Sequence, residues 1–404
     1  MKIHPVLNRS QRLLLLVLAA INFLHIMDFM ILMPLAPQLM RSLHIDAASF
    51  SLLVASYSIA AGSASFAGTF FVDRFARKLV LLSCFAGFTG GTFLCAFSES
   101  YPLLLGARIF TGFLGGIIGS QVMSLVADTF PPQVRGRATG MVMAGFSAAS
   151  VLGVPAGLYL GTILGWQSAF LAIAFLAILV FFAALKVLPK GIRHLVEGRK
   201  NANDRKLLRQ ILSYPEHRLA LLFTLLVSFS HFTIIPFLSP YMVSNVGFKE
   251  IDLSYIYMTG GGITLFTGPF IGKLSDRFGP ARVYVVLILI AFIPQLCISN
   301  MPPVSIWVAL IFTSLLFVFS GGRFVPSQTL TLNAVVPRYR GGFMSLNSSL
   351  MQLSSGSASY LAGKVVFALP DGKLQNYGIL GISTVIFSII TIPIALKLGK
   401  AFKK

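Results

Sequence analysis

Long apolar segments follow one another along almost the whole chain, and only short polar turns separate most of them. A helix needs about 20 mostly apolar residues to cross the hydrocarbon core of a bilayer, so the pattern predicts an all-α integral membrane protein with about twelve transmembrane helices. In the first half of the chain these helices are expected at residues 12–38, 47–71, 79–98, 101–128, 138–163 and 166–188. In the second half they are expected at residues 218–241, 252–272, 283–300, 303–334, 342–367 and 375–398.

One longer polar stretch, residues 186–218, interrupts this pattern near the middle of the chain. It predicts a bundle of about six helices in residues 1–188, a cytoplasmic linker in 189–217 and a second bundle of about six helices in 218–404. Within the linker, the segment from Asp204 to Leu212 has the pattern of a short amphipathic helix that lies on the inner membrane surface.

The composition supports a membrane protein. Hydrophobic residues make up 56% of the chain and charged residues 11%, whereas soluble domains carry about 25% charged residues. A water-soluble fold of this length could not cover its surface with so few charges. The lipid bilayer is therefore an expected partner.

The net charge of +20 would suit a nucleic-acid-binding protein, but the positions of the cations argue against that reading. Most of the 32 Lys and Arg residues fall in alternate loops and in the two tails. The exceptions are Arg41, Lys249, Lys364 and Lys373 in the opposite loops, and Arg108 and Arg323 inside apolar segments. This asymmetry follows the positive-inside rule. We expect a multi-pass protein of the plasma membrane, the inner membrane of a bacterium, with both termini in the cytoplasm and no nucleic-acid partner.

Motifs of enzyme chemistry do not occur in the sequence, which has no HExxH and no Gly-Lys-Ser/Thr phosphate loop. Cys84, Cys95 and Cys297 lie in apolar segments without a CxxC pair or a metal-ligand spacing. We therefore expect no enzymatic activity, no cofactor and no metal. A membrane-embedded sensor or enzyme is a much weaker alternative to a transporter.

Two loop motifs recur in the second half of the chain. Asp276 follows Asp73 by 203 residues, each in the loop after the second helix of its half, and Arg340 follows Arg135 by 205 residues, each after the fourth. Two parallel repeats of this kind place a solute site at their interface, near the middle of the membrane.

These motifs resemble those of the major facilitator superfamily, along essentially the whole chain. The second-half loop motif, Gly272 to Gly279 with Arg282, matches the family pattern, whereas the first-half copy carries Thr69 and Ala76 at the two glycine positions. The resemblance implies a cytoplasmic latch for the outward-facing state, in which Asp73 accepts from the N-terminus of the eleventh helix and Arg77 pairs with Asp128. The simpler alternative is that these cations only set the topology. The predicted gating residues are Asp73, Arg74, Arg77, Asp128, Arg135, Asp276, Arg277 and Arg340.

Helices four and five carry further family-like patterns. Arg108, Gly112 and Gly116 lie four residues apart in helix four, and helix five contains Gly153, Pro155 and Gly157. They resemble the drug:proton antiporter and sugar efflux branch of the superfamily. Small residues also serve ordinary helix packing, which is the alternative interpretation.

A few polar side chains are expected at membrane depth, where each is a candidate functional group. Asp28 is the one acid that we place there, about 24 Å from the cytoplasmic end of its helix, and Arg108 lies about 30 Å in, so the two are expected to pair. A carboxylate binds its proton more tightly when buried and less tightly beside a cation. We therefore assign proton coupling to Asp28, His25 and Arg108, the alternative being a static ion pair between helices one and four.

Six other polar residues are predicted to bind solute, near the interface of the halves: Asn22, Gln121, His231, Arg323, Asn347 and Gln352. For Arg323, binding of a substrate anion and stabilisation of its own helix are equally supported. The expected function is export of a small organic solute, drug-like, sugar or metabolite, by proton antiport. Proton-coupled uptake is the alternative. The expected partners are the solute, protons and lipid, and the chain is expected to be a monomer.

Overall fold

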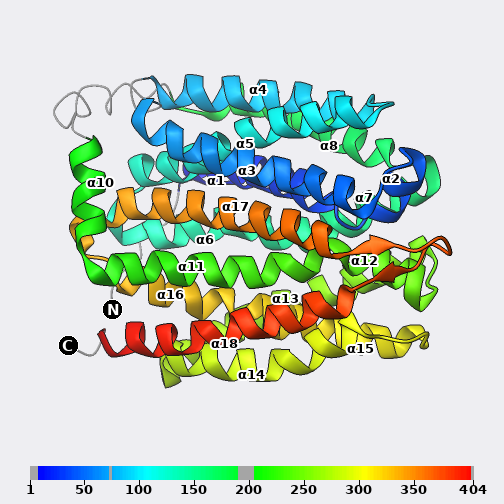
Figure 1. Ribbon diagram of the computed structural model, residues 1–404. Coiled ribbons are helices and arrows are strands. Elements are labelled where there is room, and N and C mark those ends of the chain that lie inside the picture. The colour runs from blue at the N-terminus through cyan, green and yellow to red at the C-terminus, as the bar shows by residue number, and fades with distance from the viewer. Residues whose placement is uncertain (1–7, 72–74, 190–203, 402–404) are drawn as a thin grey trace.

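The computed structural model describes residues 8–71, 75–189 and 204–401. Its long helices lie side by side with roughly parallel axes (Figure 1). The first half contains α1 (Arg9–Ile31), α2 (Ala36–Ser42), α3 (Ala47–Phe71), α4 (Arg77–Ala96), α5 (Tyr101–Thr129), α6 (Pro132–Ala148), η2 (Ala149–Gly153), α7 (Val154–Leu164) and α8 (Gln167–Val187).

The second half begins with α10 (Asp204–Ser213) and α11 (Pro215–Ile234). It continues with η3 (Ile235–Phe237), α12 (Leu238–Tyr241), η4 (Met242–Val246), α13 (Glu250–Phe278), α14 (Pro280–Ser299), α15 (Ile306–Leu315), η5 (Leu316–Gly321), α16 (Phe324–Asn333), η6 (Pro337–Tyr339), α17 (Arg340–Val365) and α18 (Tyr377–Ala401).

Ten helical segments in the described residues are long and apolar enough to cross a membrane. Helices α13 and α17 contain 29 and 26 residues, which is long enough at about 1.5 Å per residue. They are not among the ten, and α17 is rich in serine and glycine. Composition thus supports ten of the expected crossings, and the other two stay a prediction.

The chain is not purely helical as expected, because a short β-hairpin precedes α18. Two strands of two residues each, β1 (Phe367–Ala368) and β2 (Leu374–Gln375), pair antiparallel. The Asn245 side chain accepts from the backbone N–H of Leu374 and donates to its carbonyl, both at 2.9 Å. These bonds hold the hairpin against the end of η4, and nothing in its short polar sequence predicted them.

Two of the expected transmembrane helices contain a π-helical turn. The fifth contains the π-helical turn η2, two residues before Pro155, and the tenth contains η5, directly before Gly322 and Arg323. At η2, Pro155 has no N–H to donate and its ring crowds the preceding turn, which disturbs the regular α-helical hydrogen bonds there. No proline lies beside η5, the nearest being Pro326 in α16. Both π-turns change which residues face a neighbouring helix.

The predicted amphipathic segment after the linker forms α10, which crosses one end of the long helices (Figure 1). His217 fixes this end of the molecule. Its Nδ1 lies 2.9 Å from the carbonyl oxygen of Ile211 in α10, and its Nε2 accepts from the N–H of Val336, 3.2 Å away. Buried His217 therefore ties α10 to α11 and to the chain before α17.

The two halves meet along α3 and α17. The hydroxyl of Ser349 donates to the carbonyl of Gly62 at 2.6 Å. A Cβ added at Gly363 would lie 1.8 Å from Ser51 Oγ, and one at Gly356 would lie 2.7 Å from Ile59 Cγ1. Glycine is therefore required for this approach, and α3 and α17 are in close contact over most of their length.

Candidate functional site

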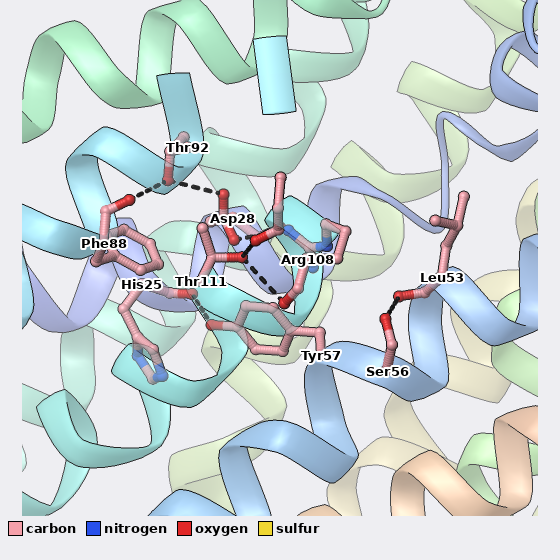
Figure 2. A network of polar contacts seen from close by, with 10 residues as sticks. His25, Asp28, Leu53, Ser56, Tyr57, Phe88, Thr92, Arg108 and Thr111 are labelled. Atoms are coloured by element: carbon pink, nitrogen blue, oxygen red, sulfur yellow. Dashed lines mark hydrogen bonds and ion pairs between the residues drawn. The ribbon is translucent and has the colours of Figure 1, made fainter. Parts of the chain in front are cut away.

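Helices α1, α4 and α5 meet around the carboxylate of Asp28 (Figure 2). Arg108 Nη1 donates to Asp28 Oδ2 at 2.7 Å and to the Asp28 carbonyl at 3.2 Å. Thr92 Oγ1 donates to Asp28 Oδ1 at 3.2 Å. The side chains of Asp28 and Arg108 are both 0% exposed. The predicted contact between Asp28 and Arg108 is therefore confirmed, whereas Thr92 was not anticipated.

Tyr57 of α3 completes the surroundings of Arg108. The Arg108 guanidinium carbon lies 4.4 Å from the centre of the Tyr57 ring, a geometry in which a cation is attracted by the ring face. Tyr57 also stacks on Phe29, with ring centres 5.4 Å apart. Tyr57 was not among the predicted site residues, because one tyrosine in an apolar helix gives no signal of this contact.

The glycines of α5 explain how Arg108 comes so close to α3. A Cβ at Gly112 would lie 2.4 Å from the carbonyl oxygen of Tyr57, and one at Gly116 would lie 2.1 Å from that of Ala61. No side chain fits at either position. The packing interpretation of this motif is thus confirmed, and the packing places Arg108 against Tyr57.

His25 lies one turn before Asp28 on α1, but the two side chains are not hydrogen-bonded in the described structure. The ring of His25 points away from the carboxylate (Figure 2), and its buried Nδ1 has no hydrogen-bond partner. The Cδ2 of His25 would lie 3.1 Å from a Cβ at Gly115. His25 is therefore near the pair without being part of it.

Arg323 has neutral partners instead of a carboxylate. Its Nη1 donates to Ser388 Oγ at 2.7 Å, and its Nη2 donates to Ser230 Oγ at 2.6 Å and to the Val227 carbonyl at 3.5 Å. The Nε of Arg323 has no partner. Arg323 is fully buried and forms no ion pair with any described residue.

His231 belongs to a second network, which Gln295 completes. His231 Nδ1 lies 3.4 Å from Ser320 Oγ, and Gln295 Nε2 donates to the same oxygen at 3.2 Å. His231 follows Asp28 by 203 residues, and Gln295 follows Thr92 by the same number. This offset equals that of the loop motif, so the two networks occupy equivalent places in the halves. The equivalence could have revealed Gln295 from the sequence.

The remaining predicted binding residues are not joined to either network in the described structure. Asn22 donates to the Val142 carbonyl at 3.2 Å and so links α1 to α6. Gln121 Oε1 and Asn347 Oδ1 are buried without a hydrogen-bond partner, and Gln352 is half-buried on α17. No single hydrogen-bonded network in the described structure therefore joins the six predicted residues.

The gating role of the predicted latch residues stays a prediction, and the structure shows one of their expected contacts. Arg77 and Asp128 form the expected ion pair. Asp73 and Arg74 lie outside the described residues, so their predicted contacts have no structural counterpart. Arg135 donates to the carbonyls of Ala127 and Phe130 at the end of α5, at 2.8 and 3.2 Å.

In the second copy of the motif, Arg277 lies over the ring of Phe278, 5.2 Å from its centre. Asp276 and Arg340 form no ion pair with a described residue.

Lys78, in the first copy of the motif, was not among the predicted gating residues. Its ammonium group donates at 2.8 Å to two carbonyls at the end of α8, those of Leu185 and Leu188.

The glycines of the helix-five motif pack against α1. A Cβ at Gly153 would lie 2.9 Å from Met27 Sδ, and one at Gly157 would lie 2.9 Å from Ile31 Cδ1. Pro155 stands in the first turn of α7, so the motif brings α7 close to the helix that carries Asp28.

Within the described ranges, no three His, Cys, Asp or Glu side chains come together as a metal site would require.

Comparisons with known proteins agree with this architecture. The family model described as Major Facilitator Superfamily matches residues 18–360. An uncharacterised MFS-type transporter of Bacillus subtilis, YbcL, is 24% identical over 383 residues, 93% of this chain and 94% of that protein. A second from the same organism, YtbD, is 29% identical over 289 residues, 71% of each chain. A chloramphenicol resistance protein of Streptomyces lividans is 27% identical over 270 residues, 66% of this chain and 68% of that protein.

Solved structures show the same fold. A bacterial homologue of the human lysosomal transporter Spinster, in an inward-facing and occupied conformation, matches with a TM-score of 0.75 at 16% identity over 98% of both chains. A D-xylose–proton symporter matches with a TM-score of 0.74 at 15% identity, over 96% of this chain and 97% of the other. The chain is a multi-pass membrane protein and a transporter, not an enzyme, and it belongs to the major facilitator superfamily.

Proposed function

We propose that this transporter exports a small organic solute by proton antiport, and that Asp28 carries the coupling proton. The observation that carries the proposal is the Asp28–Arg108 pair, fully buried between α1 and α5. A buried carboxylate remains ionised while a cation contacts it and takes up a proton when the cation moves away. Making and breaking this one contact would therefore couple a change of conformation to proton exchange.

The neighbouring groups support such a movement. Thr92 and Tyr57 contact the pair from two other helices, so a shift of α5 against α1 would change several contacts of Arg108 at once. His25 has an unpartnered Nδ1, and its backbone carbonyl accepts from the Tyr57 hydroxyl at 3.5 Å. We assign it the modulating role, as a group that exchanges protons between Asp28 and the solvent.

The rest of the proposal concerns topology and gating. Twelve transmembrane helices would form two bundles, residues 1–188 and 218–404, joined by the cytoplasmic linker 189–217, with both termini in the cytoplasm of a bacterial cell. The Arg77–Asp128 ion pair would then lie at the cytoplasmic side, as part of the latch that also involves Asp73. The carrier would act as a monomer.

Export is favoured over uptake by the chloramphenicol resistance protein among the relatives. The solute would bind between the halves, where His231 on α11 and Asn347 on α17 offer polar groups. Chloramphenicol is the first solute to test. A thermal-shift screen of amphiphilic drugs, sugars and lipid-like molecules at two pH values would extend the search, because a bound ligand stabilises the state that it binds.

Transport in proteoliposomes tests the proposal. We expect the wild-type carrier to move radiolabelled chloramphenicol against its gradient when protons flow in the opposite direction. The Asp28→Asn variant should lose this driven transport and keep passive counterflow, whereas Asp371→Asn, in an exposed loop, should behave as the wild type. ΔpH-driven accumulation by Asp28→Asn would contradict the role of Asp28, and accumulation with protons moving in the same direction would establish symport.

A further inference from the structure

Arg323 is a buried cation in the second half without a buried anion to balance it. Its side chain is fully buried, and among the described residues no carboxylate lies within ion-pair distance of it. An ionised group at membrane depth is costly and is normally paired. Arginine does not lose its proton in proteins, so its charge cannot be removed by deprotonation.

The groups around Arg323 satisfy only part of its guanidinium. Two serine hydroxyls and one carbonyl accept from the two terminal nitrogens. The two serines, Ser230 on α11 and Ser388 on α18, also lie 3.2 Å from each other. The Nε–H is buried and has no acceptor. The serines orient the guanidinium and leave its charge and its Nε donor available.

We propose that Arg323 binds a small monovalent anion at its Nε edge, between α11, α16 and α18. The ligand carries one negative charge, because one charge balances the arginine while a dianion would leave an excess charge in the hydrocarbon region. It accepts hydrogen bonds, since the unfilled position on Arg323 is a donor. A halide or a carboxylate group meets both requirements.

The anion has two possible sources, the aqueous phase and the transported solute. A halide taken from water would be a bound ion of the carrier, whereas a carboxylate on the solute would make Arg323 part of the solute site. The proposal does not depend on proton antiport, and its test uses no pH gradient.

The experiment measures the thermal stability of the purified chain in detergent at constant ionic strength. Sodium gluconate, whose polyhydroxylated anion is bulkier and more strongly hydrated than the three test anions, is the reference salt and is replaced stepwise by sodium chloride, bromide or benzoate. A ligand that binds the folded state raises the melting temperature with saturation. We expect such a saturable rise. Chloride and bromide would identify an aqueous anion, and benzoate alone would identify an anionic solute group.

One substitution places a carboxylate of the protein beside Arg323, where the added anion is proposed to bind. In Ser388→Asp a carboxylate replaces a hydroxyl that lies 2.7 Å from the Arg323 guanidinium. We expect this variant to fold and to lose the dependence on added anion. Ser388→Asn has nearly the same shape without the charge and should keep the dependence, as should Arg282→Gln, which removes an exposed arginine.

Binding of radiolabelled chloride or benzoate by equilibrium dialysis gives a second readout that does not depend on stability, with one anion expected per chain and none for Arg323→Gln. The same melting temperature in gluconate, chloride, bromide and benzoate would overturn the proposal. So would a Ser388→Asp variant that still responds to the anion as the wild type does.

Discussion

Among the described residues, each half of the chain buries one arginine, and the surroundings of the two charges differ. In the first half Arg108 donates to the Asp28 carboxylate at 2.7 Å. In the second half Arg323 donates to two serine hydroxyls and has no acid partner in the described structure. Both side chains are completely buried. Two related halves can therefore keep similar polar positions and still differ in buried charge: the Asp28–Arg108 pair is neutral, whereas Arg323 leaves one positive charge unbalanced within the described part of the chain.

The repeat offset makes this contrast specific. Asp28 and His231 are 203 residues apart, as are Thr92 and Gln295. In the first half, Arg108 and Thr92 donate to Asp28. In the second half, His231 and Gln295 both contact Ser320. The first network can exchange a proton at a carboxylate, whereas the second presents neutral donors and acceptors beside an unbalanced cation. We infer a division of labour, with protons handled by the first half and solute bound between the halves.

The largest expected effect comes from removing one arginine at a time. Arg108→Gln leaves Asp28 buried without its cation, and losing one partner of a buried pair costs about 3–5 kcal/mol of unfolding free energy. Arg323→Gln removes a charge that had no acid partner, so its cost should be clearly smaller. The measurement is thermal unfolding in detergent, with Asp28→Asn/Arg108→Gln as the control that should recover stability. Equal losses for the two single variants would remove the contrast between the halves.

A second comparison concerns glycines on the helices that carry these arginines. Gly116→Ala would place a Cβ 2.1 Å from the Ala61 carbonyl oxygen, whereas no atom lies within 4 Å of a Cβ at Gly321. We expect Gly116→Ala to cost about 1–3 kcal/mol through overpacking and Gly321→Ala to be neutral. Melting temperatures of the two variants test this, with Gly106→Ala on α5 as a matched control, because it also meets open space. A stable Gly116→Ala variant would show that α5 can move away from α3 at little cost.

The N-terminal ends of α3 and α13 differ in the residue that caps them. Asp46 Oδ1 accepts from the N–H of Ser49 at 2.8 Å, whereas in the second half Asp252 Oδ2 accepts from the N–H of Lys249 at 2.9 Å. The hydrogen bonds from Ser49 lower the pKa of the Asp46 carboxyl below its usual value. A carboxyl with a lowered pKa in the folded state contributes stability above its unfolded pKa and loses it as the pH falls through the folded pKa.

Asp46→Ala should therefore lower stability by about 1 kcal/mol at neutral pH, and the difference from the wild type should shrink as the carboxyl becomes protonated. Thermal unfolding over a series of pH values measures it. Asp46→Asn is the control, because it keeps a capping oxygen without the charge and should remove most of the pH dependence. A loss that is constant with pH would exclude the ionised cap as its cause.

The smallest effect is expected at the ion pair that joins the two halves, between Arg41 in the last turn of α2 and Glu250 at the start of α13. The Arg41 side chain is 65% exposed, and exposed pairs contribute about 0.2–1 kcal/mol. Charge reversal by Arg41→Glu or Glu250→Arg should loosen this contact, and the double reversal should restore it. Cross-linking of cysteines introduced at neighbouring positions would report the separation. If the double variant behaves like the singles, the pair does not hold the halves together.

Some parts of the site could be predicted because they depend on position along a helix. Depth in the membrane follows from the rise per residue, so opposite charges at similar depth on Asp28 and Arg108 predicted their contact. Thr92 and Tyr57 could not be found in this way, because threonine and tyrosine occur in membrane helices without a functional role. Which of their side chains reaches the pair depends on how each helix is rotated about its axis.

By itself, the sequence determined that this chain crosses a membrane many times and that Asp28, Arg108 and Arg323 lie inside apolar segments, and its recurring loop motifs predicted two related halves. These properties depend on hydrophobicity and on local spacing, which a linear chain records. Only the tertiary structure decided that Arg108 has an acid partner and that Arg323 has none among the described residues. Ser388 and Arg323 are far apart in sequence, and their contact requires three helices to pack together after the π-turn η5 has reset the rotation of α16.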